Sequence, residues 1–214
     1  GPPVTRRLSP DQYQATIADL FGSTIELGGR FDPEMRQDGL LAIGDAQLGV
    51  TSAGMEQYDN MARTIAAQVV DEHHRDLLMP CKPADAKAPD DACAKVFFTK
   101  VGRLLYRRPL TSDELGLQIG AAATGAKALD DFYKGLALSL ASMLESPQFL
   151  FRTEKAEADP DHRGGLRLDA YSKAAQLSFF LWNAAPDTEL LSAAESGKLN
   201  TAKGLAQQVD RMLA

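Results

Sequence analysis

Hydrophobic residues recur at the three- and four-residue spacing of α-helices along most of the chain, and no convincing alternation of polar and apolar residues appears. The longest such stretch, 51–78, returns large apolar side chains to one face at helical spacing. This pattern predicts an all-α fold, an irregular bundle of about seven helices with long ordered loops. The main predicted helices are 10–21, 51–78, 91–106, 128–145, 169–183, 187–197 and 201–213.

Capping residues support several of these boundaries. Ser9 with Gln12, and Thr111 with Glu114, match the capping box, in which two side chains three residues apart satisfy each other's backbone amides. The helix that opens at Thr111 is expected to be short, because the segment AAATGAK weakens it. Single N-caps are expected at Asp169, Asp187 and Thr201.

The pattern divides the chain into three segments. Residues 1–80 form an N-terminal helical segment, and 81–157 hold a cysteine-closed loop and the middle helices. Residues 158–214 begin a further helical domain that we expect to continue in polypeptide outside this chain. The last boundary lies in EKAEADPDHRGG, a charged stretch without large apolar residues. The glycine- and acid-rich loop at 22–50 is long for a plain connection and is therefore a candidate functional loop.

Composition and charge exclude two classes of protein. With 44% hydrophobic and 24% charged residues over 214 positions, the chain has the balance of a globular protein with a sizeable core. Its formal net charge of -6 argues against a general nucleic-acid binder, which gathers basic residues on one face. No window approaches the roughly 18 consecutive apolar residues expected of a membrane span.

Four stretches together carry a resemblance to a known family: RRLSPDQYQATIADLFG, VGRLLYRRPLTSDEL, SPQFLFRTE and LSFFLWNAAPDTELL. In order and spacing they resemble the PSD-type domains of unknown function, secreted bacterial domains first noted in planctomycetes and often found beside cytochrome c modules. The resemblance implies an N-terminal segment to about residue 78 and a middle segment over about 93–152. It also implies the first part of a larger segment from about residue 166.

The chain departs from the family pattern at two places. Asp38 to Ala42 reads DGLLA where the family commonly has an aspartate-glycine-phenylalanine-aspartate-asparagine loop. Gln176 stands where an arginine is usual. The resemblance carries over no catalytic residue, but it implies an exported protein, periplasmic or at the cell surface.

Cys81 and Cys93 lie in one loop, and in an exported protein this arrangement predicts a disulfide. A metal-binding pair is the alternative. The chain has no CxxCH motif, so we expect it to bind no c-type haem covalently.

Three further residues are candidate metal ligands. His73 and His74 are neighbours on the predicted helix and point about 100° apart, so they cannot chelate one metal from one face. We interpret them as surface histidines near a helix end, although one could join distant ligands. Asp38 lies among the acids of the 22–50 loop, where calcium is conceivable, but their spacing does not match an EF-hand.

Trp182 is the chain's single tryptophan and ends an aromatic run before Pro186 and Asp187. Ordinary helix capping accounts for the motif by packing. A role in stacking a ligand or relaying an electron is the alternative.

Three functions are compatible with these observations. The resemblance favours part of an exported composite redox enzyme, whose active site is completed by a second chain or by the C-terminal remainder of the same precursor. A metal or haem would then lie in that partner portion, and a cytochrome c is a candidate partner. The alternative is a non-catalytic helical scaffold or binding module. A polysaccharide-active hydrolase, with Asp38 and Asp187 as its two carboxylates, is a weaker alternative.

Overall fold

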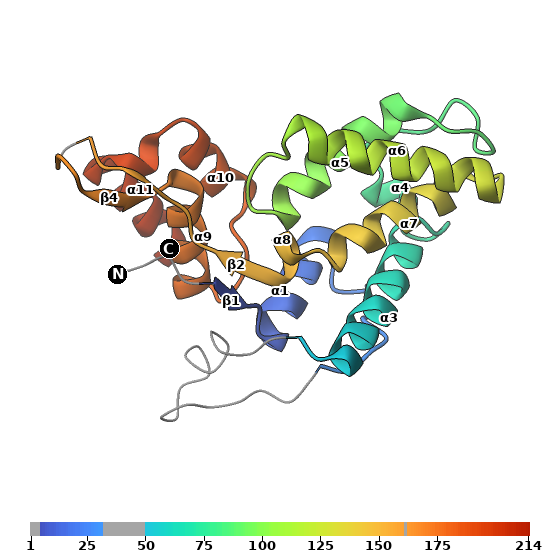
Figure 1. The fold of residues 1–214 in the computed structure, drawn as a ribbon, viewed down its shortest axis with the longest axis horizontal. Helices are drawn as coiled ribbons and strands as arrows, with labels where there is room; N and C mark the ends of the chain where they lie inside the picture. Colours follow the sequence, from blue (N-terminus) through green and yellow to red (C-terminus); the bar gives the residue numbers. More distant parts are fainter. Residues whose placement is uncertain (1–4, 32–49, 161) are drawn as a thin grey trace. The chain divides into compact units, whose positions relative to one another are not determined.

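The computed structural model describes residues 5–31, 50–160 and 162–214 (Figure 1). This part of the chain contains ten α-helices, one 3-10 helix and two small antiparallel sheets, so the all-α prediction is confirmed. The predicted number of about seven helices is too low. The four-residue helices α4 (Arg75–Leu78) and α8 (Pro147–Leu150) are too short to produce a periodic pattern in the sequence.

The chain folds as two compact units. The central unit comprises the described residues 16–31 and 50–150, and the terminal unit comprises 5–15, 151–160 and 162–214. Helix α1 (Pro10–Phe21) begins at the predicted capping box, in which the Ser9 amide donates to Gln12 Oε1 at 3.2 Å and the Gln12 amide donates to Ser9 Oγ at 3.3 Å.

Four helices build most of the central unit: α3 (Ser52–Val69), α5 (Asp91–Leu105), α6 (Ser112–Leu129) and α7 (Phe132–Leu144). Helix α7 contacts each of the other three. Large side chains from all of these elements except α6 fill the core and are excluded from solvent. They include Met61, Ile65, Phe97, Phe98, Leu105, Leu136 and Leu140.

Helices α6 and α7 approach each other closely at Gly135. A Cβ atom at this position would lie 2.4 Å from the Ala122 carbonyl oxygen and 2.4 Å from the Ala126 nitrogen, so only glycine fits. The prediction that α6 would be short is wrong, since it runs for 18 residues. The glycines of α6 have weak helix propensity. The small residues of this helix nevertheless form its buried face against α7, so tertiary packing overrides local propensity there.

The predicted helix at 51–78 is interrupted after α3. The Asp71 Oδ1 atom accepts the backbone amides of His73 and His74, each at 2.9 Å, and so stabilises a turn in place of further helix. The chain resumes helical structure at α4.

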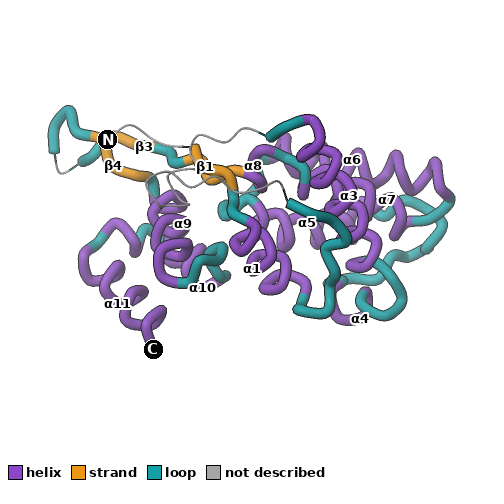
Figure 2. The backbone as a smooth tube through the Cα atoms, turned by 90° about the horizontal axis from the view of Figure 1, so that it is seen from below, coloured by secondary structure: helices purple, strands orange, loops and turns teal. Residues whose placement is uncertain are grey.

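The terminal unit contains both small sheets (Figure 2). Strand β1 (Thr5–Arg7) pairs antiparallel with β2 (Phe151–Thr153), and β3 (Ala156–Ala158) pairs antiparallel with β4 (Leu166–Leu168). Sequence patterns did not predict these strands, because three residues are too few to show alternation. The charged stretch at the expected segment boundary belongs to the β3–β4 hairpin.

The remaining elements of the terminal unit are helical: α9 (Ala170–Leu181), α10 (Thr188–Glu195), the 3-10 helix η1 (Lys198–Asn200) and α11 (Ala202–Leu213). The caps predicted at Asp169, Asp187 and Thr201 are all confirmed. A core formed by Ala174, Leu190, Ala193, Ala194, Leu199 and Met212 holds these helices together. Among the described helices, none is both long and apolar enough to cross a membrane.

Glu114 connects the start of α6 to an arginine. It completes the predicted capping box with Thr111, and its Oε1 atom lies 2.7 Å from Nη2 of Arg108. Hydrogen bonding from Arg108, opposed by burial and supported by the Thr111 amide, lowers the pKa of Glu114 from 4.5 to about 2. The ionised carboxylate therefore stabilises the folded state.

We predict that Glu114→Gln lowers the free energy of unfolding by about 2 kcal/mol at pH 7, the pKa shift discounted for partial exposure. Because the folded-state pKa is depressed, this contribution is present above about pH 4.5 and is lost as the pH falls towards 2. Urea denaturation across this pH range, with Asp113→Asn as the exposed neighbouring control, measures the difference. A Glu114→Gln deficit that persists unchanged at pH 2 would contradict the ionic origin.

Candidate functional site

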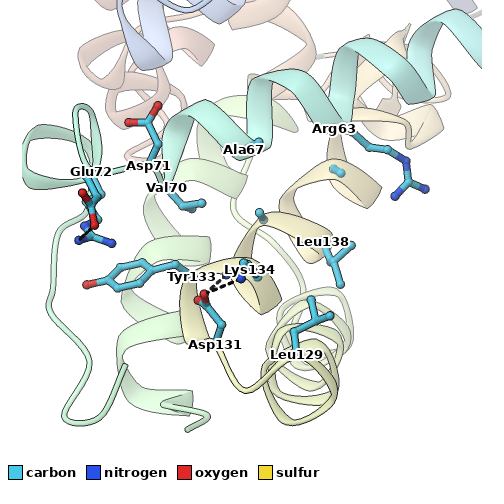
Figure 3. A pocket seen from close by; sticks show the side chains of 13 residues that line it. Arg63, Ala67, Val70, Asp71, Glu72, Leu129, Asp131, Tyr133, Lys134 and Leu138 are labelled. Carbon is cyan, nitrogen blue, oxygen red and sulfur yellow. Dashed lines mark hydrogen bonds and ion pairs between the residues drawn. The ribbon is translucent and has the colours of Figure 1, made fainter. Parts of the chain in front are cut away.

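An open groove of about 510 Å³ lies between α3 and α7 in the central unit (Figure 3). This volume falls within the range typical of small-molecule sites. The groove exists because alanines occupy several facing positions, where larger side chains would fill the space between the helices. Its apolar wall consists of Ala67, Val70, Leu129, Ala137, Leu138 and Ala141.

Charged residues form the two ends of the groove. Figure 3 shows Arg63 at one end and Asp71 and Glu72 at the other. The Arg75 guanidinium lies 4.6 Å from the centroid of the Tyr133 ring and 3.5 Å from Glu72 Oε1. A cation over an aromatic face is a favourable contact, so Arg75 and Tyr133 stabilise each other's positions.

Two carboxylates of the groove are satisfied by nearby groups of the protein. Besides the two backbone amides of the turn, Asp71 Oδ1 lies 2.8 Å from His74 Nδ1. Asp131 caps α7 by accepting the Lys134 amide at 3.1 Å, and its Oδ2 atom lies 3.3 Å from Lys134 Nζ. Asp71 Oδ1 and both oxygens of Asp131 are therefore used within the protein.

Arg63 differs from these carboxylates, because only one nitrogen atom of its guanidinium group donates hydrogen bonds within the part of the protein that the structure describes. Nε donates to Asp59 Oδ1 at 2.8 Å and to Oδ2 at 3.0 Å. In the described part of the chain, Nη1 and Nη2 of Arg63 donate no hydrogen bond. The side chain is 60% exposed and so remains able to bind a further acceptor.

The carboxyl group of Asp59 also interacts electrostatically with that of Glu145, the C-cap of α7. The hydrogen bond from Arg63 lowers the pKa of Asp59. Burial, followed by the negative charge of Asp59, raises the pKa of Glu145. As the pH rises, Asp59 therefore loses its proton before Glu145 does.

The predicted metal candidates do not form a cluster in the described residues. His73 is exposed beyond the end of α3, and His74 contacts Asp71. Within residues 5–31, 50–160 and 162–214, no group of three or more histidine, cysteine, aspartate or glutamate side chains could hold a metal ion. Asp38 and the other acids of its loop lie outside the described residues.

The disulfide prediction is confirmed. The sulfur atoms of Cys81 and Cys93 are 2.01 Å apart, and the bond closes a loop with a sequence separation of 12 onto the first turn of α5. Because both sulfurs are used in this bond, the pair does not ligate a metal.

Trp182 has a structural role in the terminal unit. Its indole Nε1 donates to the Met212 carbonyl at 2.9 Å, and the Arg211 guanidinium lies 5.5 Å from the ring centroid. Arg211 also binds Asp187 at 2.8 Å, while Asp187 accepts the Leu190 amide as the N-cap of α10. These contacts agree with the packing interpretation; a ligand-stacking or electron-relay role for Trp182 stays a prediction.

Sequence reasoning missed the groove. Leu138 carried the available signal, because it lies off the apolar stripe of α7 and yet is apolar; it is 44% exposed. Ala67 is a small residue on the polar face of its predicted helix, so nothing in the local sequence pattern indicates that it lines a groove.

Comparison with known families found three matches. Residues 6–71 match PSD3, a protein of unknown function (DUF1587). Residues 93–154 match PSD5, a protein of unknown function (DUF1595), and residues 168–214 match PSD4, a protein of unknown function (DUF1592). No curated protein and no solved structure matched the chain.

We predict that replacing both cysteines, in Cys81→Ala/Cys93→Ala, lowers the free energy of unfolding by about 3 kcal/mol, the value that closure of such a loop gives in the chain-entropy model. Urea denaturation with and without reductant tests this. Reductant should destabilise the natural protein by a similar amount and leave the variant unchanged. Equal stability of the natural protein in both conditions would contradict the prediction.

We predict that Glu145→Gln makes the protein more stable than the natural chain at pH 7 but not at pH 4. Because the folded-state pKa of Glu145 is raised, its protonated form stabilises the fold, and this contribution is lost as the pH rises through the folded-state pKa. A glutamine at this position cannot ionise, so the variant does not place a second negative charge beside Asp59. Urea denaturation from pH 4 to pH 8 measures the difference, which should grow with pH; a constant difference would overturn the assignment.

Proposed function

Because the chain belongs to the PSD-type family of domains of unknown function, we propose that it is the binding part of an exported composite redox enzyme. In this proposal the α3–α7 groove holds a ligand or substrate, and the redox centre is completed by further polypeptide. The observation that carries the binding role is the groove itself, an open apolar recess with charged ends. The cytochrome association that the family resemblance implies supports the redox role.

The disulfide is compatible with export, since such bonds persist in oxidising compartments. In the groove, the chain's own residues would orient a ligand and exclude water from its apolar part. We assign no electron-transfer step to them.

A second candidate function is a non-catalytic binding module. Several large apolar side chains of the terminal unit are exposed, which is a feature of protein interaction surfaces when they lie together. They include Phe180, Leu166 and Leu213, at 84%, 74% and 68% exposure. In this case the protein would form a stable complex that has no redox centre.

The test is native mass spectrometry of the protein isolated from its source, followed by absorption spectra before and after dithionite. We expect additional polypeptide to remain bound and a reducible chromophore or redox metal to be present. A complex without a redox centre would favour the binding module, and a bare chain that is optically silent would contradict both candidates.

A variant that fills the groove tests whether the groove takes part in reduction of this redox centre. We expect Ala67→Trp to preserve the complex and its redox centre but to slow reduction of that centre by an extract of the source cells at least tenfold. Ala121→Trp, at an exposed alanine of α6, is the matched control and should leave the rate unchanged. Equal rates in both variants would separate the groove from the redox function.

A further inference from the structure

The geometry points to a specific class of ligand for the α3–α7 groove: a small monocarboxylate with an apolar body, bound through Arg63. This inference rests on the proposed binding function of the groove and adds the chemistry of its occupant.

Unused hydrogen-bond donors lie at the Arg63 end of the groove, whereas Asp71 and Glu72 keep acceptor oxygens at the other end. Asp71 and Asp131 already accept hydrogen bonds or ion pairs from adjacent residues. Arg63 keeps both terminal nitrogens without a partner in the described part of the chain. A guanidinium presents two parallel N–H groups that match the two oxygens of a carboxylate. An anionic head group therefore complements the Arg63 end.

The opposite end of the groove disfavours an anion. Glu72, which is 84% exposed at its side chain, and Asp71 both lie there, and they would repel a carboxylate. Arg75 is held against Tyr133 and Glu72, so its charge is partly compensated. Acids also lie beside Arg63, namely Asp59 and Glu145, so the orientation depends on the unused Nη donors of Arg63. A monocarboxylate is expected to bind with its charge towards these donors.

The space between the ends suits an apolar body. From Arg63 to Val70 the helix advances by about 10 Å. Along this length the wall is mainly aliphatic, with Ala67 and Val70 on one side and Ala137, Leu138 and Ala141 on the other. Lys134 also lines the groove, but its ammonium pairs with Asp131 at 3.3 Å. Burying apolar ligand surface there would contribute roughly 25 cal/mol per Å². A dicarboxylate or a sugar would leave polar groups against this wall.

Asp59 provides an internal test of the inference. It occupies Nε of Arg63 and partly neutralises the charge of the guanidinium. Removing its charge in Asp59→Asn should strengthen the attraction of Arg63 for an added carboxylate. A variant that tightens binding cannot be explained by damage to the fold.

The experiment titrates the protein with octanoate, 1-octanol and octylamine, and follows backbone amide shifts by NMR together with heat by calorimetry. We expect saturable binding of octanoate that shifts α3 and α7 amides, weaker binding of 1-octanol and the weakest binding of octylamine. Arg63→Gln should weaken octanoate binding roughly tenfold, the loss expected for a charge-assisted hydrogen bond. Asp59→Asn should tighten it.

Two controls complete the design. Arg163→Gln removes an exposed arginine of the terminal unit and should leave octanoate binding unchanged. Ala67→Trp should abolish binding of all three probes, whereas Ala121→Trp should not.

The outcomes distinguish the two levels of the proposal. Equal affinity for octanoate and 1-octanol, with no effect of Arg63→Gln, would overturn the carboxylate inference and leave the groove as a binding site for neutral apolar ligands. Binding that is insensitive to Ala67→Trp, or no binding of any probe, would overturn the inference and also remove the groove from the proposed function.

Discussion

The close approach of α6 and α7 at Gly135 is the constraint on which the groove depends. With backbone atoms of α6 in the space that a Cβ would need, α7 is held at one distance and one rotation on α6. That rotation directs Leu136 and Leu140 into the core. It leaves the partly buried Ala137 and the exposed Leu138 facing the groove, and with the buried Ala141 they form one of its walls. A larger residue at position 135 would therefore alter the groove from its far side.

The charges of the groove follow from helix termini more than from a ligand. Asp131 is needed as the N-cap of α7, and Asp71 stabilises the turn that ends α3. Both carboxylates would be present in this fold without any function. Arg63 has no such local duty beyond an exposed pair with Asp59, and exposed pairs contribute little stability. Lys134 pairs with Asp131, and Arg75 contacts Tyr133 and Glu72. For this reason the proposed ligand recognition is assigned to Arg63.

Features encoded by a few neighbouring residues could be predicted from the sequence, and features that depend on distant residues could not. The capping boxes at Ser9 and Thr111 and the caps at Asp169 and Asp187 involve side chains three residues from their targets, so local chemistry determines them. The disulfide likewise closes a short loop. The full length of α6 was missed because its stability comes from contact with α7.

The groove lies beyond local prediction for the same reason. Ala67 and Leu138 are separated by 71 positions in sequence, and neither residue alone indicates a site. They line one groove because α3 packs on α7, and the sequence pattern of each helix does not determine this packing. Trp182 shows the converse case, because its conspicuous place in the sequence drew attention to a residue whose indole is used in packing.

The fold also joins segments that the family matches describe separately. One wall of the groove comes from the end of the first matched segment, and the other comes from the second. The β1–β2 sheet likewise pairs the beginning of the first segment with the end of the second. Neither segment alone could form the groove or complete this sheet. Any function of the groove therefore belongs to the combination of segments, and this gives a physical reason for the two to occur in one chain.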